Sequence, residues 1–342
     1  MDPLWLLGTA GILLSLFFAF TNGYNDAGAD VATIVSSGTA SIKGALLTAA
    51  ICNFTGAMIG GSAVVLTLQG VLTDVALSSL GVAIFSAVVA ANAWNLFSWY
   101  YGIPSSSTHA LIGGLIGVGI AIHGLSGVNW GWSEMLGGQL TGVAKVLVFL
   151  SASVMLGFGG SFLIMKLTRV LLRKATVRVN RELKRAQWVT TGVQTLAHGA
   201  NDSQKQMALI ALLLMAMGSS SAAVPLWVRV GCAMAIALGS LGGGYRIMRT
   251  VGRKIFKIRP VHALVAQGNS SLTVIFSTIV GAPVSSTQVV TAGVMGVGTA
   301  ENRKLVHWRV GKDLLVSWLM TIPASAIMGW GITVLLMTLT GV

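Results

Sequence analysis

The chain has 342 residues, of which 54% are hydrophobic and only 9% are charged. Soluble domains carry about 25% charged residues, so this deficit excludes an ordinary soluble globular enzyme. The 43 glycines, set against six prolines, are typical of polytopic membrane proteins, in which glycine permits close contact between helices. The net charge of +13 would indicate a nucleic-acid partner in a soluble chain, so the location of the positive charges must be considered.

Apolar segments long enough to cross a bilayer follow one another along the chain. A membrane helix needs about 20 apolar residues, and we predict an all-α polytopic membrane protein. The N-terminal sequence lacks a basic region and a small-residue cleavage pattern, so we expect a retained first span rather than a signal peptide. The predicted segments are 4–40 (interrupted), 43–68, 76–100, 103–123 (interrupted), 139–165, 188–217 (interrupted), 222–245, 260–281, 283–298 (interrupted) and 313–341.

Positive side chains gather in the connections between some of these segments. Nineteen of the 22 Lys and Arg residues lie at Lys43 or in the stretches Lys166 to Arg185, Arg246 to Arg259 and Arg303 to Lys312. Loops rich in Lys and Arg face the cytoplasm. The loops that contain neither residue are 69–75, 124–138 and 218–221. The pattern predicts a multi-pass protein of the inner (cytoplasmic) membrane with both termini outside, and it accounts for the positive charge without a nucleic-acid partner.

The sequence contains an internal repeat. Asn25-Asp26, in TNGYNDAGADVAT, matches Asn201-Asp202, in AHGANDSQKQMAL, at an offset of 176 residues. A second pair follows in the same order, because GIPSSSTHALIGGLIGVG matches GAPVSSTQVVTAGVMGVG at an offset of 179 residues. Two matches at nearly one offset indicate a duplication.

The repeat predicts the organisation of the chain. Five segments precede the basic connection and five follow it, and an odd number per half reverses the second half in the membrane. We therefore predict an N-terminal transmembrane repeat at 1–165, a basic cytoplasmic connector at 166–187 and an inverted C-terminal repeat at 188–342. Secondary transporters share this plan, and their sites form near the membrane midplane from interrupted or re-entrant helices.

The two Asn-Asp pairs are candidate sites for a coupling ion. An ionised Asp near the bilayer centre costs about 2.5 to 3.5 kcal/mol on insertion scales and is usually retained for function. Carboxylate and amide oxygens are hard ligands suited to sodium, a proton or a divalent ion. We predict such a site at Asn25, Asp26, Asn201 and Asp202, with the two aspartates as the metal ligands if the ion is a metal. The alternative is that each Asp only caps a broken helix.

The second repeated motif is typical of an anion site. Proline suits the first turn of a helix, and free N–H groups, the positive helix end and hydroxyl donors together bind anions. Two such half-helices that meet would enclose a tetrahedral oxyanion, whereas the alternative is hydroxyl bonding within each helix. The hydroxyl side chains that follow Pro104 and Pro283 are Ser105, Ser106, Ser107 and Thr108 in the first motif, and Ser285, Ser286 and Thr287 in the second.

Two further polar residues lie within the predicted spans. Lys205 follows Asp202 by three residues and is expected to neutralise it, to act as a fixed cation beside the bound anion, or to take part in proton coupling. His109 is a candidate proton relay, although a single His is as often a structural hydrogen-bonding residue.

At these residues the sequence resembles the inorganic phosphate transporter (PiT) family, whose signature is a repeated Gly-Xaa-Asn-Asp element followed in each half by a Gly-Xaa-Pro element with Ser, Thr and His. The resemblance covers nearly the whole chain. It is strongest to the bacterial branch of the family in three stretches, 94–119, 198–214 and 281–323. It implies symport of phosphate with protons or sodium. In the bacterial branch it implies proton coupling and uptake of neutral metal-phosphate complexes.

The resemblance also implies roles for individual residues, and the chain departs from it at three positions. The Asn-Asp pairs would serve the coupling ion and the substrate, and the two hydroxyl clusters would line the phosphate site. Many sodium-coupled members have a further Asn where this chain has Ala29 and Lys205, which argues against a full sodium site. Gln288 replaces the second His of the signature, which puts any mechanism that needs both histidines in doubt.

These observations predict a secondary active transporter, not an enzyme, that imports inorganic phosphate by proton symport with alternating access. It would need no cofactor beyond its coupling ion, would lie in membrane lipid and would form a homodimer, the commonest symmetric assembly. The alternatives are a sodium-coupled phosphate symporter, a permease for sulfate or another oxyanion, and a passive anion channel. An intramembrane aspartyl protease is a rival from another class, because two Asp residues on separate spans can share one proton, but it leaves both hydroxyl clusters unused.

Overall fold

The computed structural model describes residues 3–73, 75–219, 221 and 223–340, and within these ranges the protein consists of helices joined by turns, as the sequence predicts. The outermost residues of the two predicted repeats, 1–2 and 341–342, lie outside the described residues. The α-helices before the basic connector are α1 (Pro3–Asp30), α2 (Ala32–Ser36), α3 (Ile42–Ile59), α4 (Ala63–Gln69), α5 (Leu77–Tyr101), α6 (Ser107–His123), α7 (Trp132–Leu136) and α8 (Gly142–Leu171). Those after it are α9 (Val179–Ala216), α10 (Leu226–Gly242), α11 (Tyr245–Arg249), α12 (Pro260–Ile279), α13 (Ser286–Asn302) and α14 (Trp308–Thr340), with a π-helical turn at Thr250–Lys254.

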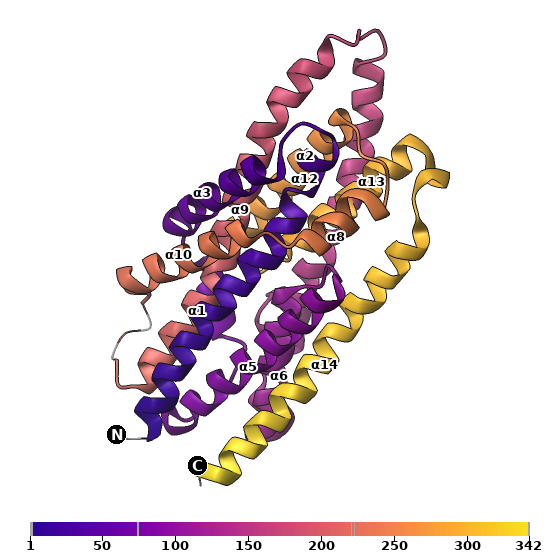
Figure 1. Cartoon of the computed structure of the whole chain (residues 1–342). Helices are drawn as coiled ribbons and strands as arrows, with labels where there is room; N and C mark the ends of the chain where they lie inside the picture. Colours follow the sequence, from indigo (N-terminus) through magenta and orange to yellow (C-terminus); the bar gives the residue numbers. More distant parts are fainter. Residues whose placement is uncertain (1–2, 74, 220, 222, 341–342) are drawn as a thin grey trace.

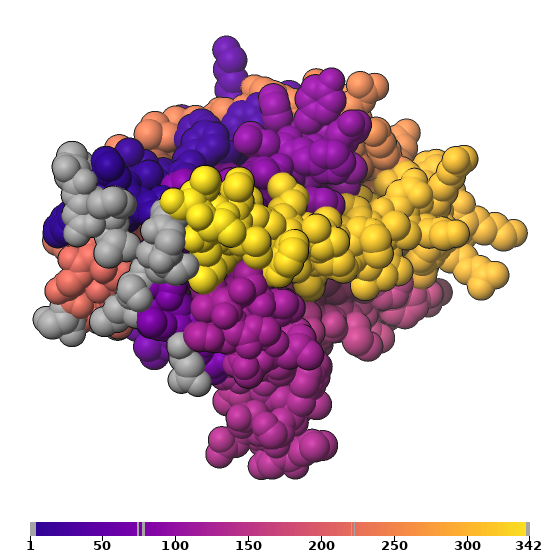
Figure 2. Space-filling view, turned by 90° about the horizontal axis from the view of Figure 1, so that it is seen from below, coloured from indigo at the N-terminus to yellow at the C-terminus, as the bar shows by residue number. Residues whose placement is uncertain are grey.

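Several of these helices are long and apolar enough to cross a membrane. Six described stretches satisfy this condition by length and composition, and α10 with the segment Tyr245–Lys254 forms a seventh that is bent by 58°. The helices expose large apolar side chains to their surroundings, for example Met155 on α8 and Ile327 on α14. Figure 2 shows α14, in yellow, lying across the surface of the molecule. The protein is therefore a membrane protein with several helical spans.

The beginning of α1 and the end of α14 lie at the same end of the molecule. Figure 1 places the first residues of α1 and the last residues of α14 at one end of the molecule, and the connection between α8 and α9 at the opposite end. That connection is the basic stretch, which contains eight of the positive side chains. The beginning of α1 and the end of α14 therefore lie at the opposite end of the helical body from the basic connector.

The helices break at the two Pro-initiated motifs, as predicted. The first loop, residues 102–106, separates α5 from α6, and the second loop, residues 281–285, separates α12 from α13. Each loop begins with a glycine in the left-handed region, Gly102 at φ +64° and Gly281 at φ +70°, a conformation that a side chain disfavours. The two helices that follow are each 17 residues long.

The predicted interruption of 4–40 lies at Val31, between α1 and α2, and not at Asn25-Asp26, whereas the interruption predicted within 188–217 is wrong. Helix α1 continues through Asn25 and Asp26 to Asp30, and α9 is one helix of 38 residues that contains Asn201 and Asp202. The side chains of both pairs hydrogen-bond to groups on other segments. Since they do not compete for the backbone of their own helix, the main-chain ladder stays intact.

The predicted span 43–68 is also wrong in one respect, because it divides into α3 and α4 at residues 60–62. Two glycines, which have low helix propensity, lie at the break. The Arg229 side chain, on α10, donates from Nη1 to the Gly60 carbonyl oxygen at 2.8 Å and to the Met58 carbonyl oxygen at 3.2 Å. This arginine therefore satisfies carbonyls at the end of α3 that lack partners within the helix.

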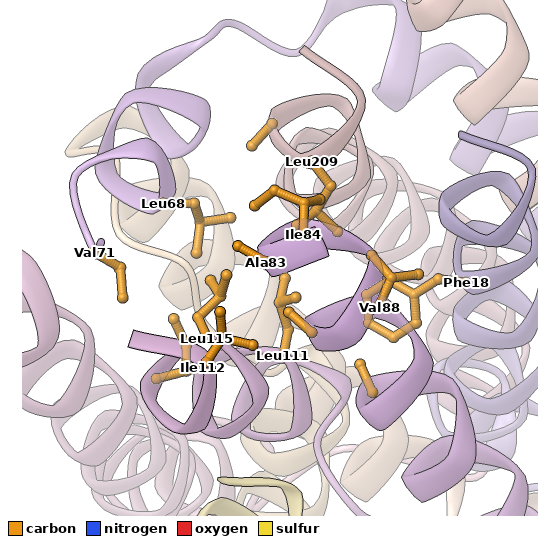
Figure 3. Packing of buried hydrophobic residues seen from close by; sticks show 14 of the residues in the cluster. Phe18, Leu68, Val71, Ala83, Ile84, Val88, Leu111, Ile112, Leu115 and Leu209 are labelled. Carbon is orange, nitrogen blue, oxygen red and sulfur yellow. The ribbon is translucent and has the colours of Figure 1, made fainter. Parts of the chain in front are cut away.

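The apolar core lies where helices from both halves of the chain meet. Figure 3 shows Leu111 from α6, Ile84 from α5 and Phe18 from α1 packed in one cluster with Leu209 from α9. These side chains are fully buried or almost so. Packing of this kind between residues far apart in the sequence fixes α1, α5, α6 and α9 relative to one another.

Close contact between α3 and α9 depends on glycine. A Cβ atom added at Gly199 would lie 2.2 Å from the Asn53 carbonyl oxygen, and one added at Gly56 would lie 2.0 Å from the Leu196 carbonyl oxygen. Small residues allow such backbone approach between membrane helices. This contact places the middle of α9, which carries the second Asn-Asp pair, directly against α3.

We predict that Gly199→Ala lowers the Tm of the purified protein, because the added Cβ has to displace helix backbone at a cost of about 1 to 3 kcal/mol. Gly192→Ala on the same helix is the matched control, since its Cβ meets only the Cys52 Sγ at 3.7 Å. A thermal unfolding measurement in one detergent compares the two variants with the wild type. Equal Tm values for both variants would contradict the proposed role of Gly199.

Candidate functional site

Helices α1 and α9 bring the two Asn-Asp pairs together in the interior, where Asp26 and Asp202 are almost fully buried. A polar residue near each aspartate contacts the aspartate of the other helix. Asn22, four residues before Asp26, donates from Nδ2 to Asp202 Oδ2 at 2.9 Å. His198, four residues before Asp202, has its Nε2 3.6 Å from Asp26 Oδ2. Residues four apart lie on one helix face, so each helix presents both groups to the other.

His198 lies at the centre of three carboxyl groups, and we call Asp26, Asp30, His198 and Asp202 the acidic centre. The His198 Nε2 is 3.6 Å from an oxygen of Asp26 and 3.6 Å from an oxygen of Asp202. On the other side of the ring, Nδ1 is 3.2 Å from Asp30 Oδ2 and 3.0 Å from Asn53 Oδ1. All four residues of the centre are buried, so these groups interact with one another rather than with water.

Lys205 is fully buried beside the acidic centre. Its Nζ lies 2.9 Å from Asp202 Oδ1 and donates to the Val284 carbonyl oxygen at 2.9 Å. It also donates to the Thr108 hydroxyl oxygen. The ammonium therefore connects the acidic centre to both of the Pro-initiated motifs.

The two Pro-initiated motifs face each other in the structure. Thr108, at the start of α6, donates its hydroxyl to the Val284 carbonyl oxygen of the second loop at 2.9 Å. His109 Nδ1, one residue after Thr108, and Gln288 Nε2, four residues after Val284, are 3.2 Å apart. The N-termini of α6 and α13 therefore converge on one small region. Since each helix N-terminus carries unpaired N–H groups and a partial positive charge, this region has two sets of N–H donors.

The serine and threonine side chains of the two motifs divide into structural and available groups. The Ser106 hydroxyl accepts a hydrogen bond from the His109 N–H, and the Ser285 hydroxyl accepts one from the Gln288 N–H, so both cap their helices. Ser105 donates to Ser98 Oγ at 2.7 Å. By contrast, the Ser286 hydroxyl is buried and has no hydrogen-bond partner among the described residues. A buried unpaired hydroxyl at this place is available to a ligand.

Thr287 connects the second motif to the acidic centre. Its hydroxyl donates to Asp26 Oδ1 at 2.5 Å. The Lys205 ammonium makes the corresponding connection in the first motif, because it contacts both Thr108 and Asp202. The candidate anion site and the candidate cation site are therefore adjacent and share hydrogen bonds. The buried Ser107 completes the first hydroxyl cluster.

The asparagines of the two pairs hold backbone in place. Asn201 donates from Nδ2 to the Ala282 carbonyl oxygen at 3.1 Å and accepts at Oδ1 from the Val284 N–H at 3.3 Å. Asn25 instead donates to the Asn95 carbonyl oxygen of α5 at 3.3 Å. Asn25 also lines a cavity of about 240 Å³ between α1 and α5. The structure thus places the Asn201 amide against the second loop, whereas the Asn25 amide faces α5.

Threonines on short helices fix the starts of both loops. Thr67, on α4, donates to the Gly281 carbonyl oxygen at 2.6 Å and accepts from Lys145 Nζ at 3.0 Å. Thr250 donates to the Gly102 carbonyl oxygen at 3.3 Å. In each case the threonine and the loop come from different halves of the chain.

The acidic centre has the composition of a cation site. One oxygen each from Asp26 and Asp202 and one ring nitrogen of His198 lie within 4.8 Å of one another. Carboxylate and imidazole groups take up protons and also bind divalent metals. The convergent helix N-termini with the Ser286 hydroxyl have the composition of an oxyanion site.

The sequence does not by itself identify His198, Asn22 or Asp30 as residues of the site. A signal was present, because the offset of 176 residues that relates the Asn-Asp pairs also relates Asn22 to His198. Polar residues at the same helical position of both repeats lie on the face that carries Asp26 and Asp202. Applying the repeat offset to the polar residues near each Asn-Asp pair would therefore have identified Asn22 and His198.

Comparison with known proteins shows the family. The model of the phosphate transporter family matches residues 22–329, which include both Asn-Asp pairs and both Pro-initiated motifs. The chain belongs to the phosphate transporter family. The transporter is 34% identical over 332 residues to a probable low-affinity inorganic phosphate transporter of Bacillus subtilis (strain 168), covering 96% of this chain and 97% of the relative.

Further comparisons agree with this assignment. The transporter is 37% identical over 319 residues to a probable low-affinity inorganic phosphate transporter of Rhizobium meliloti (strain 1021), covering 92% of each chain. A solved structure of a sodium-dependent phosphate transporter has the same fold, with a TM-score of 0.87 at 24% identity over 97% of this chain and 99% of that one. The predicted family and fold class, and the prediction that the chain is a transporter rather than an enzyme, are confirmed.

We predict that Ser286→Ala raises the KM for phosphate uptake by about 10- to 100-fold, since a hydrogen bond to a charged ligand contributes about 1.5 to 3 kcal/mol. The Tm should be unchanged, because the Ser286 hydroxyl has no partner among the described residues to lose. Ser86→Ala is the control, since this buried hydroxyl donates to the Val82 carbonyl oxygen within its own helix. An unchanged KM in Ser286→Ala would show that this hydroxyl does not contact phosphate.

Proposed function

We propose that this phosphate transporter imports inorganic phosphate by proton symport. The observation that carries the proposal is that the candidate anion site shares a hydrogen bond, from Thr287 to Asp26, with a centre of three carboxyl groups. These carboxyl groups face one ammonium, Lys205, and one imidazole, His198. A phosphate anion that binds beside excess negative charge is repelled, so binding becomes favourable when a cation binds with it.

Several features favour protons over sodium as the coupling ion. Carboxyl and imidazole groups, which make up the acidic centre, take up protons without needing further ligands. The chain carries Ala29 and Lys205 at the positions where the sequence interpretation expects additional oxygen ligands in sodium-coupled members. His109 stays a candidate proton relay, since it is paired with Gln288 at the meeting of the two motifs. Sodium symport is the alternative.

In the proposed mechanism the two halves, 1–165 and 188–342, are inverted repeats that alternate access to the site, and 166–187 connects them. The motifs of both repeats meet at one place, as Thr108 and Val284 show. We further propose that the end with the basic connector is cytoplasmic, which places both termini outside in the inner membrane. Phosphate would then enter from the terminal end. A homodimer surrounded by lipid is the proposed assembly.

Uptake of radioactive phosphate into proteoliposomes under imposed gradients tests the proposal. An inward proton gradient should drive accumulation above the external concentration, and an inward sodium gradient without a proton gradient should not. Accumulation with sodium alone would favour the sodium alternative, and uptake that only equilibrates phosphate would indicate a passive channel. Inhibition by unlabelled sulfate as strong as that by unlabelled phosphate would contradict phosphate specificity.

We predict that Asp26→Asn and Asp202→Asn each reduce proton-driven accumulation to the level of empty vesicles, because each substitution removes one negative charge from the acidic centre, whose total charge favours uptake of the coupling cation. Asp313→Asn is the matched control, since Asp313 is exposed on α14. Size-exclusion chromatography checks that the variants fold. Near-normal accumulation in both Asp26→Asn and Asp202→Asn would contradict the assignment of the coupling site.

A second form of the substrate, a metal-phosphate complex, is favoured by one observation. The ligand atoms of Asp26, His198 and Asp202 lie close enough together to hold a metal ion. In this version the metal is cargo that enters with phosphate. Proteoliposomes given manganese and phosphate should then take up both in equal amounts, whereas phosphate uptake that is unchanged by chelation of divalent metals would exclude this version.

A further inference from the structure

Lys205 has an environment that resembles a cation site rather than a free anion-binding lysine. Its Nζ contacts a carboxylate oxygen of Asp202, the hydroxyl oxygen of Thr108 and the carbonyl oxygen of Val284. An ammonium has three N–H donors; the Thr108 and Val284 oxygens accept two of them, and the Asp202 carboxylate oxygen lies at ion-pair distance, 2.9 Å from Nζ. These three types of oxygen are the hard ligands that bind cations in proteins.

The first repeat provides the comparison. The residues that correspond to Asp202, Lys205 and Thr108 at the repeat offsets are Asp26, Ala29 and Thr287. In the first repeat the Thr287 hydroxyl donates directly to Asp26 Oδ1 at 2.5 Å. In the second repeat the ammonium lies between the corresponding pair, because Lys205 contacts both Asp202 and Thr108. Each repeat therefore has its own carboxylate and hydroxyl pair, and the second repeat differs from the first by the Lys205 ammonium between them.

We propose that the Lys205 ammonium permanently occupies the cation position of the second repeat, so that this position does not bind or release an ion during transport. The inference rests on the proposed function, since it takes Asp26 and Asp202 as the paired coupling site. It goes beyond that function by assigning exchange of the coupling cation to the Asp26 side alone. The transporter thereby moves one coupling cation fewer than a protein with two open positions.

The energetics of a buried ion pair support this assignment. Lys205 is fully buried, and so is its partner Asp202. Removing one member of a buried pair leaves the other charge uncompensated, which is strongly unfavourable. When the ammonium is removed by mutation, the carboxylate, hydroxyl and carbonyl oxygens are left facing the vacated volume, and they form an oxygen site that a small cation fills.

The proposal is tested by counting sodium ions. Lys205→Asn supplies a further amide oxygen and removes the charge, and Lys43→Asn, at an exposed lysine of α3, is the matched control. Equilibrium binding of radioactive sodium is measured at saturation on the purified full-length proteins, with choline as the replacement cation. We expect Lys205→Asn to bind one sodium ion per chain more than the wild type, and Lys43→Asn to bind the same number as the wild type. Equal sodium binding by a folded Lys205→Asn and the wild type overturns the proposal.

Lys205→Ala provides a second, independent test. Its phosphate uptake should be lost in choline and restored by sodium or by methylammonium, which replaces the missing ammonium. If Lys205 variants do not fold in choline, solubilisation in sodium or methylammonium should recover monodisperse protein, and recovery in neither overturns the proposal. Failure of the wild type to accumulate phosphate contradicts the proposed function, whereas the sodium count does not depend on transport.

Discussion

Charged groups inside an apolar helical bundle have to compensate one another, and this requirement governs the arrangement around α1 and α9. An isolated Asp at membrane depth costs about 2.5 to 3.5 kcal/mol on insertion scales. Here Asp26, Asp30 and Asp202 are buried together, and the His198 ring lies within 3.6 Å of an oxygen of each. Lys205 neutralises the remaining oxygen of Asp202. Asp26 and Asp30 on α1 have His198 of α9 as their partner, and Asp202 of α9 accepts a hydrogen bond from Asn22 of α1, so these groups hold the two halves of the chain together.

In the proposed function, the same arrangement connects the coupling site with the anion site. Asp26 directs one oxygen to the Thr287 hydroxyl and the other toward His198. Asp202 directs one oxygen to Lys205 and the other to Asn22. Asp26 therefore contacts the second motif directly through Thr287, whereas Asp202 is connected to both motifs through the Lys205 ammonium. A change in the charge of the centre acts directly on the groups that would hold phosphate, which is the physical coupling that a symporter needs.

The sequence predicted features that depend on local chemistry. Pro104 and Pro283 mark the helix breaks, because proline and the preceding glycines disfavour a continuous helix, and the repeat located the buried charges. The sequence did not reveal that α1 and α9 continue through the Asn-Asp pairs, because the partners of these side chains lie on other segments. It likewise missed the end of α3, where Arg229 supplies donors to Gly60 from a position 169 residues away. His198 was missed because its role depends on a contact across the repeats with Asp26.

The central claim is that phosphate binds where the N-termini of α6 and α13 converge, beside the acidic centre. A crystal structure with bound arsenate tests it most directly, because the anomalous signal of arsenic locates a phosphate-like anion without reference to the protein density. The account predicts an arsenic peak between the first turns of α6 and α13, with the Ser286 hydroxyl in hydrogen-bonding contact with an arsenate oxygen. An arsenic peak elsewhere, for example in the cavity lined by Arg169 and Arg259, with none between α6 and α13, would contradict it.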